Sequence, residues 1–258
     1  MVRTEADTEE HSAFSIILVP TSTPGYRIQR TTHVLGTDGD HSEVVYEDVR
    51  VPFTNLIGRR GAGFLIAQER LGPGRIFHCM RWIGQAQRAF DLMCDRLVKR
   101  KLPRRQAERT GGAETVLGDK QLMKKHVFDS YCEISAHRLM TLAAAEKMDA
   151  GEYARVELAA AKAWGAGMLC RVLDRAVQVW GAKGLTDDTP LGGMYRHARA
   201  SRFYDGPDEV HMDTVGRLVL REYNNGRRWD FGAGGATNGP KHAVDHMAVH
   251  ATVNKARL

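Results

Sequence analysis

The second half of the chain turns at the stretch Phe203-Tyr204-Asp205-Gly206-Pro207-Asp208-Glu209-Val210-His211, which separates two segments of helical periodicity. A Gly-Pro pair interrupts a helix, so we expect Asp205 on a turn, from which its carboxylate can project into a cavity. The alternative is a surface turn in which the acid caps the helix that follows. The residues alone leave both interpretations open.

Helical patterns occupy most of the chain around this turn. Apolar residues recur at spacings of three, four and seven to make one stripe, which consists of Ile76, Met80, Ile83, Phe90, Met93 and Leu97. Gly72-Pro73-Gly74 is expected to kink or break the start of that helix. Further long helices are predicted over about 119–148 and 152–180. The glycines Gly181 to Gly184 are expected to end the second of these. Two shorter helices are predicted, one before Tyr204 and one after Pro207. Long helices with short connections favour an antiparallel bundle.

The first sixty residues read as strands. The segments Phe14–Val19, Tyr26–Thr31 and Val44–Val51 have β-type composition, with a polar loop predicted at Gly36–Asp40. Three strands are too few for an independent core, so they are expected to be half of a larger sheet. The sequence therefore predicts a mainly α protein with a partial β domain at 1–57, a helical bundle at 58–223 and a disordered tail at 224–258.

Composition excludes several other classes of protein. The 258 residues include four widely spaced cysteines without a CxxC pair, and they contain no apolar stretch long enough to span a membrane. The N-terminus lacks the features of a secretory signal, so a cytoplasmic location is expected. His242, His246 and His250 would share one helix face, but a solvated tail is favoured over a metal site there.

Five segments, in this order along the chain, together resemble the acyl-CoA dehydrogenase family. They are Tyr46–Pro52 (YEDVRVP), Gly58–Phe64 (GRRGAGF), Gly84–Ala89 (GQAQRA), Gln178–Gly184 (QVWGAKG) and Tyr204–Val210 (YDGPDEV). The last is similar to the family's Tyr-Glu-Gly-Thr-Ser-Glu-Ile signature, and it looks most like the subgroup related to dehydrogenases that are fused to a kinase-like domain. Each segment is weak alone, but their number and order are specific.

The resemblance implies a flavin-dependent oxidoreductase of fatty acid and lipid metabolism. Such an enzyme dehydrogenates an acyl-CoA thioester between its α- and β-carbons, with FAD as the cofactor. Asp205 occupies the position of the family's catalytic Glu, and would therefore be the base that removes the α-proton. Aspartate is one methylene shorter than glutamate, so the backbone or the substrate must come closer.

Further site residues are implied by position in the matched segments. Those expected to contact the cofactor are Gln121, Gln178, Val179, Trp180, Gly181, Ala182, Pro207 and Glu209. Those expected to contact the substrate are Gly72, Pro73, Gly74, Arg75, Gly206 and Arg217. The family's acid in the substrate-binding stretch is Gly72 here, and Arg109 matches the family's flavin-contacting arginine poorly.

The resemblance also implies partners and leaves alternatives open. Acyl-CoA would be the substrate, an electron-transfer flavoprotein the acceptor, and a homodimer or homotetramer the assembly. Family members have an N-terminal helical domain and a complete β domain, so this chain is expected to be a fragment, a truncated product or half of a split enzyme. The main alternative is a catalytically silent oligomerisation module. A nucleic-acid binder that uses the basic residues of 99–105 and the C-terminal tail is weaker, because such basic runs are usually solvated.

Overall fold

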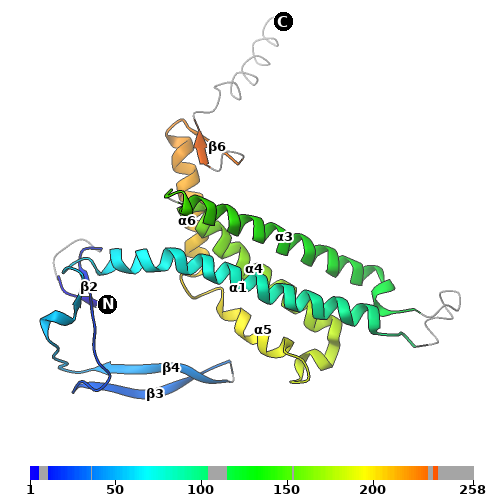
Figure 1. The fold of residues 1–258 in the computed structure, drawn as a ribbon, viewed down its shortest axis with the longest axis horizontal. Helices are drawn as coiled ribbons and strands as arrows, with labels where there is room; N and C mark the ends of the chain where they lie inside the picture. Colours follow the sequence, from blue (N-terminus) through cyan, green and yellow to red (C-terminus); the bar gives the residue numbers. More distant parts are fainter. Residues whose placement is uncertain (6–10, 36, 104–114, 153, 232–234, 238–258) are drawn as a thin grey trace, which may run out of the picture.

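The computed structural model describes residues 1–5, 11–35, 37–103, 115–152, 154–231 and 235–237, without the side chains of 37–40, 236 and 237. The described residues form a helical bundle, with the N-terminal β segments beside the start of the first long helix and a small strand pair beyond the last helix (Figure 1). Its α-helices are α1 (Gly63–Lys99), α3 (Gln121–Asp149), α4 (Arg155–Trp180), α5 (Leu191–Ala200) and α6 (Asp208–Asn224). The predicted mainly α bundle is confirmed.

Helix α4 is the centre of the bundle, because α1, α3, α5 and α6 all pack against it. Small residues allow this close packing, and Ala161, Gly165, Ala166 and Ala176 are all buried on α4. Larger apolar side chains from α1 and α4, including Met93 and Leu169, complete the core. The central position of α4 makes it a rigid support for residues that contact the turn before α6.

Helix α1 differs from the sequence expectation in two ways. It continues as α-helix through Pro73, so the chain does not break at Gly72-Pro73-Gly74, where a kink or a break was predicted; packing along the helix outweighs the loss of one backbone hydrogen bond. Toward its N-terminal end, the buried face of α1 also differs from the predicted apolar stripe: Cys79 and Trp82 are buried in the core, while Met80 of the stripe is exposed. Helical periodicity in sequence locates a helix better than it locates the buried face, because polar and apolar residues mix here.

The β segments form small antiparallel units. Strands β1 (Val2–Arg3), β2 (Phe14–Ile17) and β5 (Leu56–Ile57) make one sheet, in the order β1-β2-β5. Strands β3 (Tyr26–Val34) and β4 (Thr37–Tyr46) make a hairpin, in which Tyr26 pairs with Tyr46 and Val34 with Thr37. The strand predicted at Val44–Val51 and the loop at Gly36–Asp40 are therefore wrong in position, because hairpin pairing draws residues 37–40 into β4.

Beyond α6, strands β6 (Arg228–Asp230) and β7 (Gly235–Thr237) pair with each other. The predicted histidine cluster at 242, 246 and 250 lies outside the described residues. In the described part of the chain, no group of three potential metal ligands comes together. None of the described helices combines the length and apolar character required to cross a bilayer.

The start of α1 is tied closely to β2. A side chain at Gly63 would lie 2.8 Å from the Phe14 carbonyl oxygen, so only glycine permits this contact. The backbone N–H of Gly61 also donates to Ser15 Oγ at 3.0 Å. These contacts fix the direction in which α1 leaves the β segments and enters the bundle, where its residues 74–82 approach the turn before α6.

Candidate functional site

The turn predicted around Asp205 connects α5 to α6. The N–H groups of Phe203 and Tyr204 both donate to the Ala200 carbonyl, at 3.0 and 3.3 Å, which folds the chain back after α5. Asp205 has a φ of +53° and Gly206 a φ of +106°. Aspartate tolerates the left-handed region better than most residues, but for any residue with a side chain this conformation must be held by its surroundings.

The Asp205 carboxylate points into the protein. Its side chain is 14% exposed, and Oδ2 lies 2.9 Å from His78 Nε2 on α1. Oδ2 is buried, and the imidazole of His78 is its close polar neighbour. A side chain at Gly74 would begin 3.6 Å from the same oxygen. A buried carboxylate whose close polar neighbour is a histidine is a candidate reactive group.

The imidazole of His78 lies beside this carboxylate. Its side chain is 20% exposed, and burial lowers its pKa from the usual value, although the nearby Asp205 charge acts in the opposite direction. Burial therefore favours the neutral imidazole over its protonated form. A neutral ring leaves the negative charge of Asp205 available to accept a proton, whereas a permanently charged partner would weaken it as a base.

The backbone of the turn is held from two sides. Arg75 Nε donates to the Asp205 carbonyl oxygen at 3.2 Å, and His211 Nε2 lies 3.1 Å from the same oxygen. Arg75 comes from α1, whereas His211 comes from α6, so the turn is clamped between these helices. Arg75 was predicted to contact the substrate; in the structure its Nε already supports the residue that carries the carboxylate.

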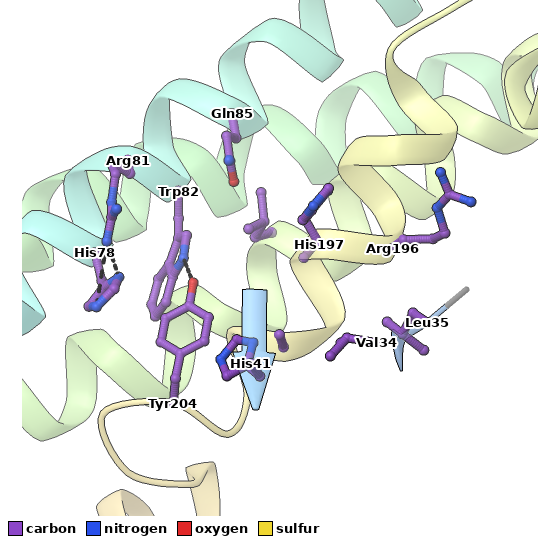
Figure 2. A pocket seen from close by; sticks show the side chains of 13 residues that line it. Val34, Leu35, His41, His78, Arg81, Trp82, Gln85, Arg196, His197 and Tyr204 are labelled. Atoms are coloured by element: carbon purple, nitrogen blue, oxygen red, sulfur yellow. Dashed lines mark hydrogen bonds between the residues drawn. The ribbon is translucent and has the colours of Figure 1, made fainter. Parts of the chain in front are cut away.

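A cavity of about 690 Å³ borders the turn (Figure 2). Its wall includes His78 and Trp82 from α1, Tyr204 from the turn and His197 from α5. Trp82 Nε1 donates to the Tyr204 hydroxyl at 2.8 Å, and the His78 and Tyr204 rings lie 4.6 Å apart. Figure 2 shows these rings side by side. The arrangement gives an aromatic surface immediately next to Asp205, with room for an organic ligand.

Most of the residues predicted to bind a flavin, all except Pro207 and Glu209, lie at the other end of the bundle. Gln121 is exposed at the start of α3, while Gln178 is exposed and Gly181, with a φ of +66°, ends α4. Ala182 follows and is also exposed. Trp180 Nε1 donates to the carbonyl of Leu92, which on helical rise is about 25 Å along α1 from Arg75. One chain therefore does not bring these residues together with Asp205.

The remaining predicted residues have varied surroundings. Val179 is buried in the core, so its side chain has a packing role. Pro207 is half-buried directly before α6, and Glu209 is exposed in the first turn of that helix. Arg217 is exposed and lies 3.8 Å from Asp213. On α1, a side chain at Gly72 would meet no atom within 4 Å, and Pro73 is exposed.

Sequence reasoning missed several residues that contact the turn. They are His78, Lys162 and Asp208, and a role for His211 was also not foreseen. Two signals were present in the sequence. His78 lies one helical turn after Arg75, and Lys162 interrupts an alanine-rich segment that otherwise reads as a buried helix face.

Comparison with known proteins gives a consistent result. The family model described as "Acyl-CoA dehydrogenase, C-terminal domain" matches residues 61–220. The Mycobacterium tuberculosis protein FadE2, named a probable acyl-CoA dehydrogenase, is 43% identical over 224 residues, which cover 85% of this chain and 53% of that protein. The human protein "Acyl-CoA dehydrogenase family member 11" is 40% identical over 218 residues, covering 82% of this chain and 27% of that protein.

Solved structures agree with the sequence relatives. A Mycobacterium abscessus structure described as an acyl-CoA dehydrogenase superposes with a TM-score of 0.76 at 34% identity, and the match covers 84% of this chain and 52% of that chain. The chain thus spans about half the length of FadE2 and about a quarter of the human relative.

Proposed function

The chain belongs to the acyl-CoA dehydrogenase family, and from that premise we propose that it takes part in α,β-dehydrogenation of an acyl-CoA thioester with Asp205 as the α-proton base. The observation that carries the proposal is the buried Oδ2 of Asp205, which lies 2.9 Å from His78 Nε2, and His78 and Tyr204 line the neighbouring aromatic-walled cavity. Oδ2 would take the α-proton as the carbon–carbon double bond forms. The chemistry that FAD supplies when bound is acceptance of the β-hydride.

The residues proposed for FAD fit a cofactor that is presented from outside this bundle. Gln121, Gln178 and Ala182 are exposed, and no atom lies within 4 Å of a side-chain position at Gly181, so a ligand can approach that backbone closely. Their separation from Asp205 suits contact with the flavin of a neighbouring subunit. Val179 and Trp180 would contribute backbone groups, because their side chains pack within the bundle.

Other contacts are proposed nearer the turn. Gly74 leaves space beside the Asp205 carboxylate, and Gly206 follows it directly, so both would line the path of the substrate. Pro207 and Glu209 would face the flavin. The CoA moiety would lie toward Gly72, Pro73, Arg75 and Arg217, where cations suit its phosphates.

The proposed partners follow from the family. They are an acyl-CoA, an electron-transfer flavoprotein as acceptor, and further copies of this chain in a homodimer or homotetramer. A cytoplasmic location stays a prediction. Because the chain covers only part of its relatives, the activity is proposed for this chain acting together with the remaining portion of a dehydrogenase.

The test uses a hybrid enzyme in which this chain replaces the matching half of FadE2. The purified hybrid should bind FAD, and acyl-CoA added without oxygen should bleach its visible absorbance. Asp205→Asn should keep FAD binding but slow the bleaching by roughly 10²- to 10⁴-fold, because the general base is lost. Stopped-flow absorbance at the flavin band measures both properties.

A matched control is Asp149→Asn, which removes an exposed carboxylate at the last residue of α3. Its bleaching rate should equal that of the parent hybrid. Equal rates for Asp205→Asn and the parent would remove Asp205 from the role of base. A colourless hybrid that takes up no FAD would instead favour the silent oligomerisation module.

A further inference from the structure

We propose that Lys162 is a positioning residue, which holds the turn in the conformation that directs the Asp205 carboxylate toward His78 and Gly74 of α1. The catalytic meaning of this role rests on the function proposed above. The contact itself concerns only atoms of this chain: Lys162 Nζ donates to the Gly206 carbonyl oxygen at 2.5 Å. Lys162 lies on α4, the central helix, so it supports the turn from the interior of the bundle.

Lys162 is a lysine in a place where lysines are rarely found. Its side chain is 0% exposed, and burial lowers its pKa from the usual value, which the neighbouring Asp208 charge partly opposes. Removing an ammonium from water is strongly unfavourable unless charges and hydrogen bonds compensate. Asp208 supplies that compensation, since its Oδ1 lies 3.5 Å from Nζ.

Asp208 joins the turn to a second cation. Its side chain is 3% exposed, and its Oδ2 accepts from Arg202 Nε at 2.7 Å. Arg202 precedes the turn and Asp208 begins α6, so this pair closes the base of the turn. Lys162 adds the connection to α4. Lys162 and Arg202 thus hold the carboxylate of Asp208 between them, and Asp208 directly follows the Asp205-Gly206-Pro207 segment.

The donors converge on two successive carbonyls of the turn. Arg75 and His211 reach the Asp205 carbonyl, while Lys162 reaches that of Gly206. With both carbonyls held, the left-handed backbone at Asp205 is retained, and the side chain must leave toward Gly74 and His78. Without the ammonium, Gly206 loses its partner and Asp208 becomes less compensated, so the turn can relax and move the carboxylate.

The experiment replaces Lys162 by Met, which has similar length but no charge. The matched control is Lys147→Met, which removes a lysine of α3 from an ion pair with Glu157 of α4. Lys147 Nζ lies 2.6 Å from Glu157 Oε1, and the two side chains are 23% and 18% exposed. The readout is the ring signals of His78 and His211 in isotope-labelled chain, which NMR records between pH 5 and 8. His78→Gln and His211→Gln variants assign the two signals.

Both lysine variants should lower the melting temperature, but only Lys162→Met should shift the His78 and His211 signals and their titration midpoints. Unmoved signals in a folded Lys162→Met chain would overturn the proposal. If that variant fails to fold, Arg202→Met takes its place, because Arg202 is half-exposed and supports Asp208 from the outside. Shifts there support the positioning network, and their absence contradicts it.

The hybrid enzyme supplies a second, separable result. Lys162→Met should lower kcat at least tenfold with little change in KM, since the base is displaced while the substrate contacts remain; Lys147→Met should leave kcat within twofold of the parent. If Asp205→Asn does not slow reduction, the proposed function fails, yet the histidine signals still decide whether Lys162 positions the turn.

Discussion

At the scale of single residues, a second buried histidine illustrates how packing sets charge. His137 on α3 is fully buried, and its ring occupies the space that a side chain at Gly165 would need. Burial lowers the pKa of His137 to about 4 from its usual 6.5. The folded protein therefore holds this ring neutral at pH values where the unfolded chain would already protonate it.

His137 should make stability sensitive to acid. Its contribution is fully present above pH 6.5 and is lost as the pH falls toward 4, because the unfolded chain then binds a proton that the folded chain excludes. Between pH 7.5 and 4.5 the loss should be about 2–3 kcal/mol. Urea unfolding of His137→Gln should show a correspondingly smaller pH dependence than the parent chain.

The exposed His197 provides the control for this effect. His197→Gln should keep the pH dependence of the parent chain. A parent and a His137→Gln variant that lose the same free energy of unfolding on acidification would show that His137 is not the source.

At the scale of elements, close packing of α3 against α4 depends on small residues. Gly165 is buried on α4 with the His137 ring directly against it, whereas Gly84 on α1 is exposed, with no atom within 4 Å of a side-chain position. Both glycines are within helices, so alanine removes the same backbone freedom at each. Packing alone should therefore decide the difference.

Gly165→Ala should destabilise the chain by about 1–3 kcal/mol, because the new methyl group forces α3 and α4 apart. Gly84→Ala should stabilise it by about 0.5–1 kcal/mol through helix propensity. Denaturant midpoints of the two variants measured side by side test this. Changes of the same sign would mean that the helix spacing at Gly165 is not limiting.

At the scale of the whole molecule, the outer face of α3 is apolar and uncovered in a single chain. The exposed side chains that share this face are Phe128, Tyr131, Leu139 and Leu142. Figure 1 shows α3 at the edge of the bundle. Contiguous apolar stripes of this kind favour association, which agrees with the predicted homo-oligomer.

The chain should therefore self-associate through this stripe. Leu139→Lys should raise the dissociation constant by at least about tenfold, because a buried leucine contributes roughly 1.5–3 kcal/mol. Leu220→Lys, which changes an exposed leucine on α6, should have little effect. Sedimentation velocity over a range of concentrations measures both. A monomeric parent chain, or equal effects of the two variants, would contradict the assignment of the interface to α3.

The sequence by itself determined the elements and the turn. Helical periodicity, the glycine that ends α4 and the Gly206-Pro207 pair are local signals, because they act through backbone conformations and spacings within a few residues. The five matched segments likewise identified Asp205 as the candidate base. Local signals were less reliable in the β segments, where β4 lies earlier than expected because strand pairing sets its limits.

Only the tertiary structure decided what surrounds Asp205. Arg75 and Lys162 contact the turn from 130 and 44 residues away in sequence, and the flavin-binding candidate Gln178 lies at the opposite end of the bundle. Which faces of the helices meet depends on the packing of all the helices around α4, and no local pattern encodes it. For the same reason, only the structure shows the ammonium of Lys162 against the Gly206 carbonyl oxygen of the turn.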